Sequence, residues 1–560
     1  MRLKNKKKLI IDPDEIFLDS RNLPLFNTQQ LEGQLEKPIG KQTLGLLLGV
    51  FLLGLAIFLG KIYQLQISRG EALAERSEHN TLRNTPIFPQ RGVIYDRHGL
   101  ELAWNNPEER VYREESGIAH VVGYLGYSSD SELNASSSNY DPRELVGRDG
   151  AERVWNETLR GQTGIQIEEV NVRNEIQSEY LLQLPRTGEN LTLSIDTKLQ
   201  EKLYASIETL AKERGFSGGA GVLLDVKTGE LLSLVSYPEY DPKNIPQFLT
   251  DPNKPFLNRA VSGLYTPGSI IKLVIAVGAL NEKIIDPATK ILSTGVLTLP
   301  NPFSPDQPSL FRDWKAHGLV NLRQALAVSS DVYFYEVGGG FENQRGLGIA
   351  NIDKYARLFG LGEPTGINWP SEEIGNIPTP EWKKVNFPAD PIWRIGDTYH
   401  TAIGQYGFQV TPLQMARVAG AIATNGALIT PTILVASPAD GGASTTPIQQ
   451  PVRDIGSAIS PETFQIVREG MRLAVTEGTA QVLNTPSVAM AAKTGTAELG
   501  VSKNYVNSWA IGFFPYETPR YAFAVIMEHG RIGTISGVGG ASIMREFIDW
   551  LSVNAPEYLR

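Results

Sequence analysis

The sequence predicts an α+β protein whose main domain is an antiparallel sheet flanked by helices, preceded by a membrane anchor and an elongated pedestal domain. Two pairs of strand-like runs are each joined by a short turn, which predicts hairpins and therefore an antiparallel sheet. Two segments with apolar residues at helical spacing predict helices that cover the sheet. An uncharged run of nineteen residues between Lys41 and Lys61 predicts the anchor.

Composition restricts the function before any motif is considered. The chain has 560 residues, which is too long for one ordinary core and predicts two or three folded units. Its 52 basic and 61 acidic side chains give a net charge of −9, which disfavours a nucleic-acid binder. It has no cysteine, which excludes disulfides, Cys-ligated zinc, iron–sulfur clusters and thiol nucleophiles. Covalent chemistry must therefore use Ser, Thr, Lys or a carboxylate.

The uncharged run is long enough for one membrane-spanning helix. At about 1.5 Å per residue it crosses a hydrocarbon layer of about 30 Å. A cleaved signal peptide is the alternative, but about forty residues precede the run, and no small-x-small site closely follows Gly60. Eight Lys and Arg residues lie before the run and three in residues 61–80, so the positive-inside rule predicts a cytoplasmic N-terminus. We therefore expect a tail over residues 1–42 and a helix over residues 43–60.

Residues 61–190 and 191–560 differ in pattern. The first segment is polar and broken by short apolar runs such as Val121–Leu125, which predicts the pedestal. The second begins with a helix over Thr197–Lys212 whose apolar residues share one face, and its middle, residues 240–480, predicts mostly helices and loops. The two hairpins and the last helix are expected at Gly219–Asp225 with Glu230–Tyr237, Ser508–Phe514 with Arg520–Glu528, and Ala541–Leu551.

A Ser-x-x-Lys motif opens a predicted helix in the middle region. Pro267 and Gly268 form a turn, and the helix is expected to begin at Ser269. Lys272 lies three residues on, so both side chains project from one face about 5–6 Å apart, close enough for the amine to take the hydroxyl proton. This chemistry needs a neutral amine for part of the time, which burial and a second nearby cation favour. An ordinary helix start with Ser as a cap is the alternative.

Two further polar motifs interrupt apolar runs. Ser329-Ser330-Asp331 directs hydroxyls toward a cleft or, alternatively, caps a helix. An apolar strand-like stretch ends in Lys493-Thr494-Gly495-Thr496, where Gly495 permits close backbone approach by a ligand; a solvated strand end is the alternative. Each pattern is common by itself. Ser-x-x-Lys, Ser-x-Asp and Lys-Thr-Gly-Thr in this order, at intervals of 60 and 164 residues, are jointly improbable by chance.

This combination resembles the active site of the penicillin-recognising serine acyltransferases, in which the three motifs meet between a helical region and an antiparallel sheet. The resemblance extends to class B penicillin-binding proteins, and within them to the elongation-type group, penicillin-binding protein 2. It implies a serine β-lactamase/transpeptidase-like domain over residues 191–560 and a dimerisation-like pedestal over residues 61–190. The similar blocks are Gln90–Ala103, His120–Gly126, Asn258–Lys272, Trp393–Gln405 and Thr411–Ala416.

The resemblance implies a peptidoglycan D,D-transpeptidase that works through a serine acyl-enzyme. Ser269 would attack the carbonyl of the penultimate D-alanine of a stem peptide, with Lys272 as general base. Ser329 would relay a proton to the leaving D-alanine, and Lys493 would supply positive charge. The backbone N–H groups of Ser269 and Thr496 would hold the oxyanion, and an amine of a neighbouring stem peptide would resolve the ester. The substrate-binding residues would be Asp331, Thr494, Gly495 and Thr496.

Several positions depart from the family pattern. Asp331 stands where most of the superfamily has Asn, which fits the elongation-type group, and Tyr406 takes the place of a usual glycine. Some members of the group carry zinc held by Asp, His and Cys near the second motif. Here Asp313 and His317 lie closer together than that pattern and the chain has no cysteine, so we expect no metal and no other cofactor.

The resemblance also implies partners and a location. The partners are peptidoglycan stem peptides, β-lactams, the membrane and a polytopic SEDS-type glycan polymerase that docks on the anchor and on Arg91–Ala103. The expected location is the cell (inner) membrane, with one span and an extracytoplasmic catalytic domain. Only thirteen residues separate Asn106 from His120, where relatives insert a longer head that contacts activating envelope proteins. We therefore expect reduced control through the head.

Other classes of protein share parts of this pattern. A β-lactamase or β-lactam sensor has the same three motifs, but class A β-lactamases add Glu-x-x-Leu-Asn, and the nearest segment here, Glu381–Asn386, has a different spacing. A bifunctional class A protein needs a glycosyltransferase domain, for which the 130 residues of the pedestal are too few. A non-catalytic envelope scaffold would not need Ser269, Lys272 and Lys493, and acylation by fluorescent penicillin separates it from an enzyme.

Overall fold

The chain divides into two units by its contacts. The computed structural model describes residues 40–74, 82–107, 109–133, 140–171, 175–301, 304, 306–435, 452–500, 504–532 and 539–560. One unit is formed by Met1–Thr85 with Ile167–Tyr180, and the other by Pro86–Gln166 with Leu181–Arg560. The second unit contains every candidate site residue. The expected domain limits after residues 42, 60 and 190 stay predictions.

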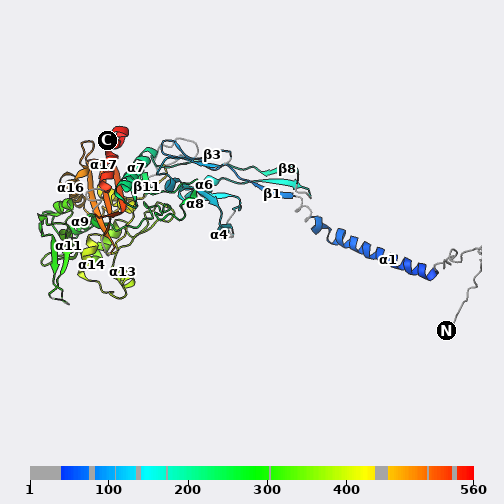
Figure 1. Cartoon of the computed structure of the whole chain (residues 1–560), viewed down its shortest axis with the longest axis horizontal. Coiled ribbons are helices and arrows are strands. Elements are labelled where there is room, and N and C mark those ends of the chain that lie inside the picture. The colour runs from blue at the N-terminus through cyan, green and yellow to red at the C-terminus, as the bar shows by residue number, and fades with distance from the viewer. Residues whose placement is uncertain are drawn as a thin grey trace, which may run out of the picture. The chain divides into compact units, whose positions relative to one another are not determined.

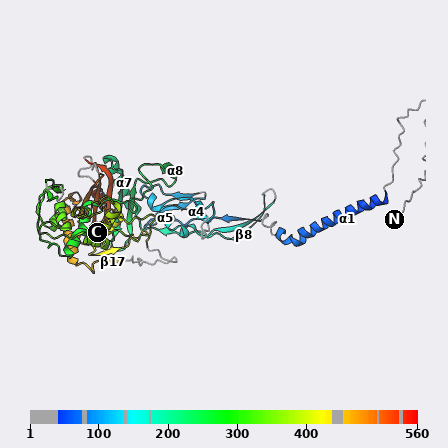
Figure 2. The ribbon, with the colours of Figure 1, turned by 90° about the horizontal axis from the view of Figure 1, so that it is seen from below.

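The first unit contains the apolar helix α1, Lys41–Tyr63, which continues into a π-helical turn, Gln64–Ser68 (Figures 1 and 2). No side chain of α1 is buried, although its sequence is rich in Leu and Phe. Within the part of the chain that the structure describes, Lys41–Ser68 is the one helix long and apolar enough to cross a membrane. The predicted span over residues 43–60 lies inside α1.

Small sheets and short helices follow between residues 82 and 192. Their bounds are β1 Leu82–Ile87, β2 Ile94–Tyr95, β3 Glu101–Asn105, β4 Arg110–Tyr112, α3 Ala119–Val122, β5 Leu125–Tyr127, α4 Asp130–Leu133, β6 Leu145–Gly147, α5 Gly150–Val154, α6 Asn156–Arg160, β7 Gly164–Val170, β8 Ile176–Gln183 and β9 Leu191–Thr192. Three sheets result, ordered β4-β3-β2-β9, β1-β7-β8 and β5-β6. The described residues of this segment form no long helix.

The main sheet of the second unit is antiparallel and has five strands. They are β10 Gly218–Asp225, β11 Leu231–Tyr237, β18 Ala491–Leu499, β19 Tyr505–Phe514 and β20 Tyr521–Arg531. Their order is β11-β10-β20-β19-β18, so the two predicted hairpins lie side by side through the β10–β20 pair, and β18 is an edge strand. The antiparallel sheet of the predicted fold class is confirmed.

Helices flank this sheet, and most of them come from the chain segment between β11 and β18 (Figure 1). The remaining elements are α7 Thr197–Arg214, α8 Ile245–Phe248, η4 Gly268–Ile271, α9 Lys272–Asn281, β12 Ile291–Ser293, β13 Val296–Leu299, β14 Ser309–Arg312, β15 Gly318–Val320, α10 Leu322–Val328, α11 Asp331–Gly339, α12 Ile349–Leu358, α13 Pro380–Asn386, α14 Ile395–Ala402, α15 Pro412–Ala423, β16 Ala427–Ile429, β17 Val452–Asp454, α16 Pro461–Thr476, η5 Gln481–Leu483, α17 Gly540–Asn554 and η6 Pro556–Leu559. The middle region also holds three two-stranded sheets, β12–β15, β13–β14 and β16–β17, which the sequence pattern did not indicate.

Two apolar cores form on the two faces of the main sheet, because its strands are apolar on both sides. Leu223 and Phe523 pack in one core with α7 and α17. Their neighbours Val222 and Ala524 point to the opposite face and belong to the core that includes α15 and α9. The predicted helices over 197–212 and 541–551 therefore cover the same face, as their apolar stripes require.

Candidate active site

The turn η4 and the helix α9 carry Ser269 and Lys272. The expected helix start is a tighter 3₁₀ turn, and Lys272 is the first residue of the α-helix. Gly268 has a φ of +55°, which favours glycine, and its N–H donates to the Gly404 carbonyl oxygen at 3.0 Å. Because α9 is apolar on every side and buried, the Lys272 side chain is fully buried, whereas Ser269 is half-buried.

The strand β18 packs directly against this turn at Gly495. A Cβ atom on Gly495 would lie 2.9 Å from Ile270 Cγ2 and 3.0 Å from the Pro267 carbonyl oxygen. A Cβ atom on Gly268 would lie 2.7 Å from the Thr496 carbonyl oxygen. The close backbone approach predicted at Gly495 is therefore an approach of η4, and it places Ser269 beside Thr496.

Side chains alternate along β18. Lys493 and Gly495 are buried, whereas Thr494 is half-buried and Thr496 is exposed. The Thr494 hydroxyl donates to the Thr479 hydroxyl at 2.7 Å. Because β18 is an edge strand of the described sheet, one side of its backbone has no partner strand there and can bind an extended peptide.

Ser329 joins the three motifs. It lies between α10 and α11 with a φ of +59°, a conformation that non-glycine residues rarely adopt. Its hydroxyl accepts a hydrogen bond from Lys493 Nζ at 2.8 Å and one from Lys272 Nζ at 3.4 Å. Lys272 Nζ also donates to the Ser329 carbonyl oxygen at 2.8 Å and forms an ion pair with Asp331 Oδ1 at 2.6 Å. The hydrogen bonds of the Lys272 amine thus go to Ser329 and Asp331 rather than to Ser269.

Charge and burial act on Lys493. Its side chain is fully buried, and its ammonium group donates to the Ser329 hydroxyl and to the Thr494 carbonyl oxygen, the latter at 2.8 Å. Burial lowers the pKa of Lys493 well below its usual value, the nearby Lys272 charge lowers it further, and the Asp331 carboxylate acts against both. The pKa of Lys493 is therefore set by burial and by Lys272, while its amine donates to the Ser329 hydroxyl.

The sequence pattern missed three residues that shape this site. The Gly404 carbonyl oxygen accepts the hydrogen bond of the Gly268 N–H. Gly404 lies in the Trp393–Gln405 segment that resembles the family, but the sequence did not indicate this contact. Thr479 contacts Thr494 and lies in a stretch without any motif. Asp313 was weighed only as a metal ligand, yet it contacts the Ser329-Ser330-Asp331 segment.

The residues around Asp313 do not fit a metal. Asp313 Oδ2 accepts hydrogen bonds from Ser330 Oγ, Ser293 Oγ and the Val332 N–H, and His317 Nε2 lies 3.5 Å from Asp313 Oδ1. No group of three or more His, Cys, Asp or Glu residues that could hold a metal ion occurs within the described ranges. The donors are those of a hydrogen-bonded carboxylate, and the expectation of a metal-free site stays a prediction.

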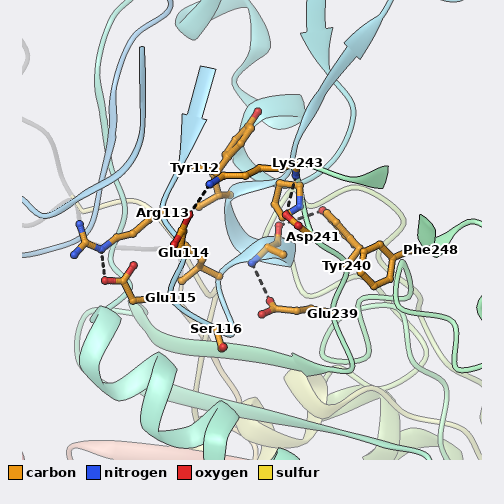
Figure 3. Close-up of a pocket in the computed structure, with 14 residues that line it drawn as sticks. Tyr112, Arg113, Glu114, Glu115, Ser116, Glu239, Tyr240, Asp241, Lys243 and Phe248 are labelled. Atoms are coloured by element: carbon orange, nitrogen blue, oxygen red, sulfur yellow. Dashed lines mark hydrogen bonds and ion pairs between the residues drawn. The ribbon is translucent and has the colours of Figure 1, made fainter. Parts of the chain in front are cut away.

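A separate cavity of about 360 Å³ lies in the second unit (Figure 3). Its lining comes from residues 112–122 and 239–248 and includes none of the predicted site residues. Glu239 is one of the lining residues, and its carboxylate accepts hydrogen bonds from the Gly117 N–H at 2.6 Å and the Ala119 N–H at 3.0 Å. Burial raises the pKa of Glu239 to about 7.

Comparison with known protein families identifies the family of the chain. The family described as "Penicillin binding protein transpeptidase domain" matches residues 219–549, which include Ser269, Ser329 and Lys493. The chain belongs to the penicillin-binding protein transpeptidase family. The family described as "Penicillin-binding Protein dimerisation domain" matches residues 106–193. The resemblance that the motifs indicated is therefore confirmed. The predicted order is confirmed with it, a dimerisation-type pedestal followed in the sequence by a transpeptidase fold.

Individual relatives of this penicillin-binding protein cover nearly its whole length. It is 30% identical to peptidoglycan D,D-transpeptidase MrdA of Acinetobacter baumannii over 92% of its own chain and 88% of the relative. The complex between penicillin-binding protein 2 and MreC of Helicobacter pylori matches with a TM-score of 0.69 and 27% identity, covering 84% of this chain and 99% of that one. A structure of a peptidoglycan synthase complex that coordinates polymerization and crosslinking matches with a TM-score of 0.68 and 26% identity, covering 92% and 98%.

These relatives confirm the predicted activity. This penicillin-binding protein is a peptidoglycan D,D-transpeptidase and a serine acyltransferase, and it is similar to the elongation-type group, penicillin-binding protein 2. The alternatives, a β-lactamase, a β-lactam sensor and a non-catalytic scaffold, have less support than the transpeptidase.

Proposed function

We propose that Ser269 is the nucleophile of this transpeptidase. Its Oγ forms a bond to the carbonyl carbon of the penultimate D-alanine while its proton passes to the Lys272 amine. The N–H groups of Ser269 and Thr496 hold the oxyanion. The bond to the terminal D-alanine nitrogen then breaks, and that nitrogen takes a proton through Ser329. The amine of a neighbouring stem peptide then attacks the ester carbonyl carbon, the bond to Ser269 Oγ breaks, and the proton that the amine loses passes through Lys272 to Ser269 Oγ, which leaves the cross-link and the free hydroxyl. β-Lactams acylate the same hydroxyl.

One observation carries this assignment. The Ser329 hydroxyl lies 2.8 Å from Lys493 Nζ and 3.4 Å from Lys272 Nζ, so residues from all three motifs share one hydrogen-bonded path for a proton. Lys493 lies in this path as a hydrogen-bond donor to the Ser329 hydroxyl, which fits the proposed role of supplying positive charge beside it.

The substrate-binding roles rest on the edge of the sheet. Thr494 and Thr496 lie on the more exposed face of β18, where their hydroxyls suit the substrate carboxylate, and Gly495 keeps the strand close to η4. The side of β18 that has no partner strand among the described residues accepts the extended stem peptide. Asp331 is one-fifth exposed and holds Lys272, which suits a role at the substrate amide.

Penicillin labelling tests the nucleophile. Full-length protein in detergent should be labelled stoichiometrically by fluorescent penicillin, and Ser269→Ala should not be labelled. A matched control is Ser262→Ala, because Ser262 precedes the same turn and its hydroxyl only donates to the Ser371 carbonyl oxygen at 2.6 Å. Ser262→Ala should be labelled as the wild type is. Stoichiometric labelling of Ser269→Ala would overturn the assignment.

We also propose that α1 anchors the protein in the cell (inner) membrane with a cytoplasmic N-terminus. The length and apolar sequence of α1 support an anchor, and the excess of Lys and Arg before it supports the orientation. An epitope fused to the N-terminus should resist protease added to spheroplasts, while the catalytic domain is digested. Digestion of the epitope would refute the orientation.

A polytopic SEDS-type glycan polymerase is the proposed partner, docking on α1 and on exposed residues of Arg91–Ala103. The similarity to a peptidoglycan synthase complex supports it. Arg91 is buried against Glu152 and Ala103 is buried, so contact would come from residues such as Leu100, which is 36% exposed. Pull-down of the polymerase should fall sharply when residues 1–60 are removed, and undiminished pull-down would exclude α1 as the docking element. The shortened head between Asn106 and His120 stays a prediction.

A further inference from the structure

Asp313 is a buried carboxylate directly beneath the second motif. It follows β14, and its side chain is fully buried. Its Oδ2 accepts hydrogen bonds from Ser330 Oγ at 2.9 Å, from the Val332 N–H at 3.0 Å and from Ser293 Oγ at 3.2 Å. Its Oδ1 accepts one from the Trp314 N–H at 2.8 Å. A buried carboxylate that accepts this many hydrogen bonds is held rigidly and restrains the groups that donate to it.

These hydrogen bonds hold the first turn of α11. Ser330 is the N-cap of this nine-residue helix, and its Oγ accepts from the Tyr333 N–H at 3.2 Å. The Ser293 and Ser330 hydroxyls are also 2.9 Å apart, so both belong to one network with Asp313. The negative charge at the helix N-terminus is favourable to the helix dipole.

The first turn of α11 decides where two site residues lie. Ser329 precedes the cap in the left-handed conformation, which is unfavourable for serine and persists only when its surroundings hold it. On the α10 side, the Ser330 N–H donates to the Ala325 carbonyl oxygen at 3.0 Å. On the α11 side, Asp313 holds Ser330. Without Asp313, Ser329 Oγ would move from Lys493, and Asp331 would move from Lys272.

We propose that Asp313 is a positioning residue for acylation. It touches neither substrate nor the reacting atoms, and it acts through Ser330 on Ser329 and Asp331. This inference rests on the proposed roles of Ser329 and Asp331. It assigns to Asp313 a hydrogen-bonding function in place of metal binding, since its donors are hydroxyl and N–H groups.

Asp313→Asn tests the proposal because it keeps the shape and replaces an acceptor by an N–H₂ group that faces donors. The matched control is Asp225→Asn. Asp225, the last residue of β10, is also buried; it accepts the Lys227 N–H at 2.8 Å and the Thr228 N–H at 3.2 Å and forms an ion pair with Arg520. Both variants should lower the unfolding temperature.

Acylation by fluorescent penicillin separates the two variants. The limiting acylation rate of Asp313→Asn should fall at least tenfold with little change in the half-saturating penicillin concentration, whereas Asp225→Asn should acylate as the wild type does. Ser330→Ala, which removes the hydroxyl that contacts Asp313, Ser293 and the Tyr333 N–H, should also slow the limiting rate. The two effects should be less than additive in the double variant with Asp313→Asn, because both substitutions disrupt the hydrogen bond between Ser330 Oγ and Asp313 Oδ2.

Each outcome has a defined meaning. If folded Asp313→Asn acylates at the wild-type rate, or if Asp313→Asn does not fold and Ser330→Ala acylates normally, the positioning role is wrong. If Asp225→Asn slows acylation as much as Asp313→Asn does, the effect is general destabilisation and the role is also wrong. Labelling of Ser269→Ala would instead overturn the proposed nucleophile, which shows that the two failures are distinguishable.

Discussion

Gly268→Ala probes the contact that places Ser269 beside β18. The added Cβ would lie 2.7 Å from the Thr496 carbonyl oxygen and 3.1 Å from its carbonyl carbon, and both atoms are backbone, so the turn or the strand must move. The φ of +55° adds a conformational cost of about 1–2 kcal/mol for alanine. Crowding adds about 1–3 kcal/mol. We expect a loss of unfolding free energy of about 2–5 kcal/mol in total.

Gly215→Ala is the matched control for the conformational part. Gly215 has a φ of +73° at the end of α7, and no atom lies within 4 Å of its virtual Cβ. It should lose only about 1–2 kcal/mol and acylate normally.

Denaturant unfolding and the rate of fluorescent-penicillin acylation measure the two effects in full-length protein. Gly268→Ala should acylate about tenfold more slowly or worse, because about 1.4 kcal/mol in the barrier is tenfold in rate. Equal stability of the two variants together with wild-type acylation by Gly268→Ala would refute the tight junction between η4 and β18.

Two further predictions follow from charge and burial. Lys272→Ala should stop acylation, whereas Lys493→Arg should only slow it, because Arg keeps the positive charge but is a larger group in a fully buried place. If neither substitution changed the rate of acylation, both lysines would be excluded from the site. Burial raises the pKa of Glu239 from 4.5 to about 7, so between these pH values the folded protein binds more protons at Glu239 than the unfolded chain does. The resulting contribution to stability is present below pH 4.5 and is lost as the pH rises through about 7. Its size is up to about 3 kcal/mol. Thermal unfolding at pH 5 and 8 should show this difference in the wild type and not in Glu239→Gln, and an equal slope in both would contradict it.

The elements that the sequence predicted well are those whose burial follows a local period. The helix over 197–212 needs only its apolar stripe and the capping carboxylate of Asp196, which accepts the Lys198 and Leu199 N–H groups. The hairpin of β19 and β20 needs only its apolar runs and the turn between them. The three motifs could also be recognised in the sequence, because the chemistry needs those residue types and each motif consists of neighbouring residues.

By itself the sequence determined the hairpins, the covering helices, the apolar helix α1 and the three motifs around Ser269, Ser329 and Lys493, since each is written in adjacent residues. Only the tertiary structure decided that β18 is an edge strand closed against η4, that Gly495 faces that turn and that Asp313 holds the cap of α11. These facts depend on contacts between residues far apart in the chain, which no local period encodes. The lowered pKa of Lys493 has the same origin, because desolvation exists only after the surrounding elements have packed.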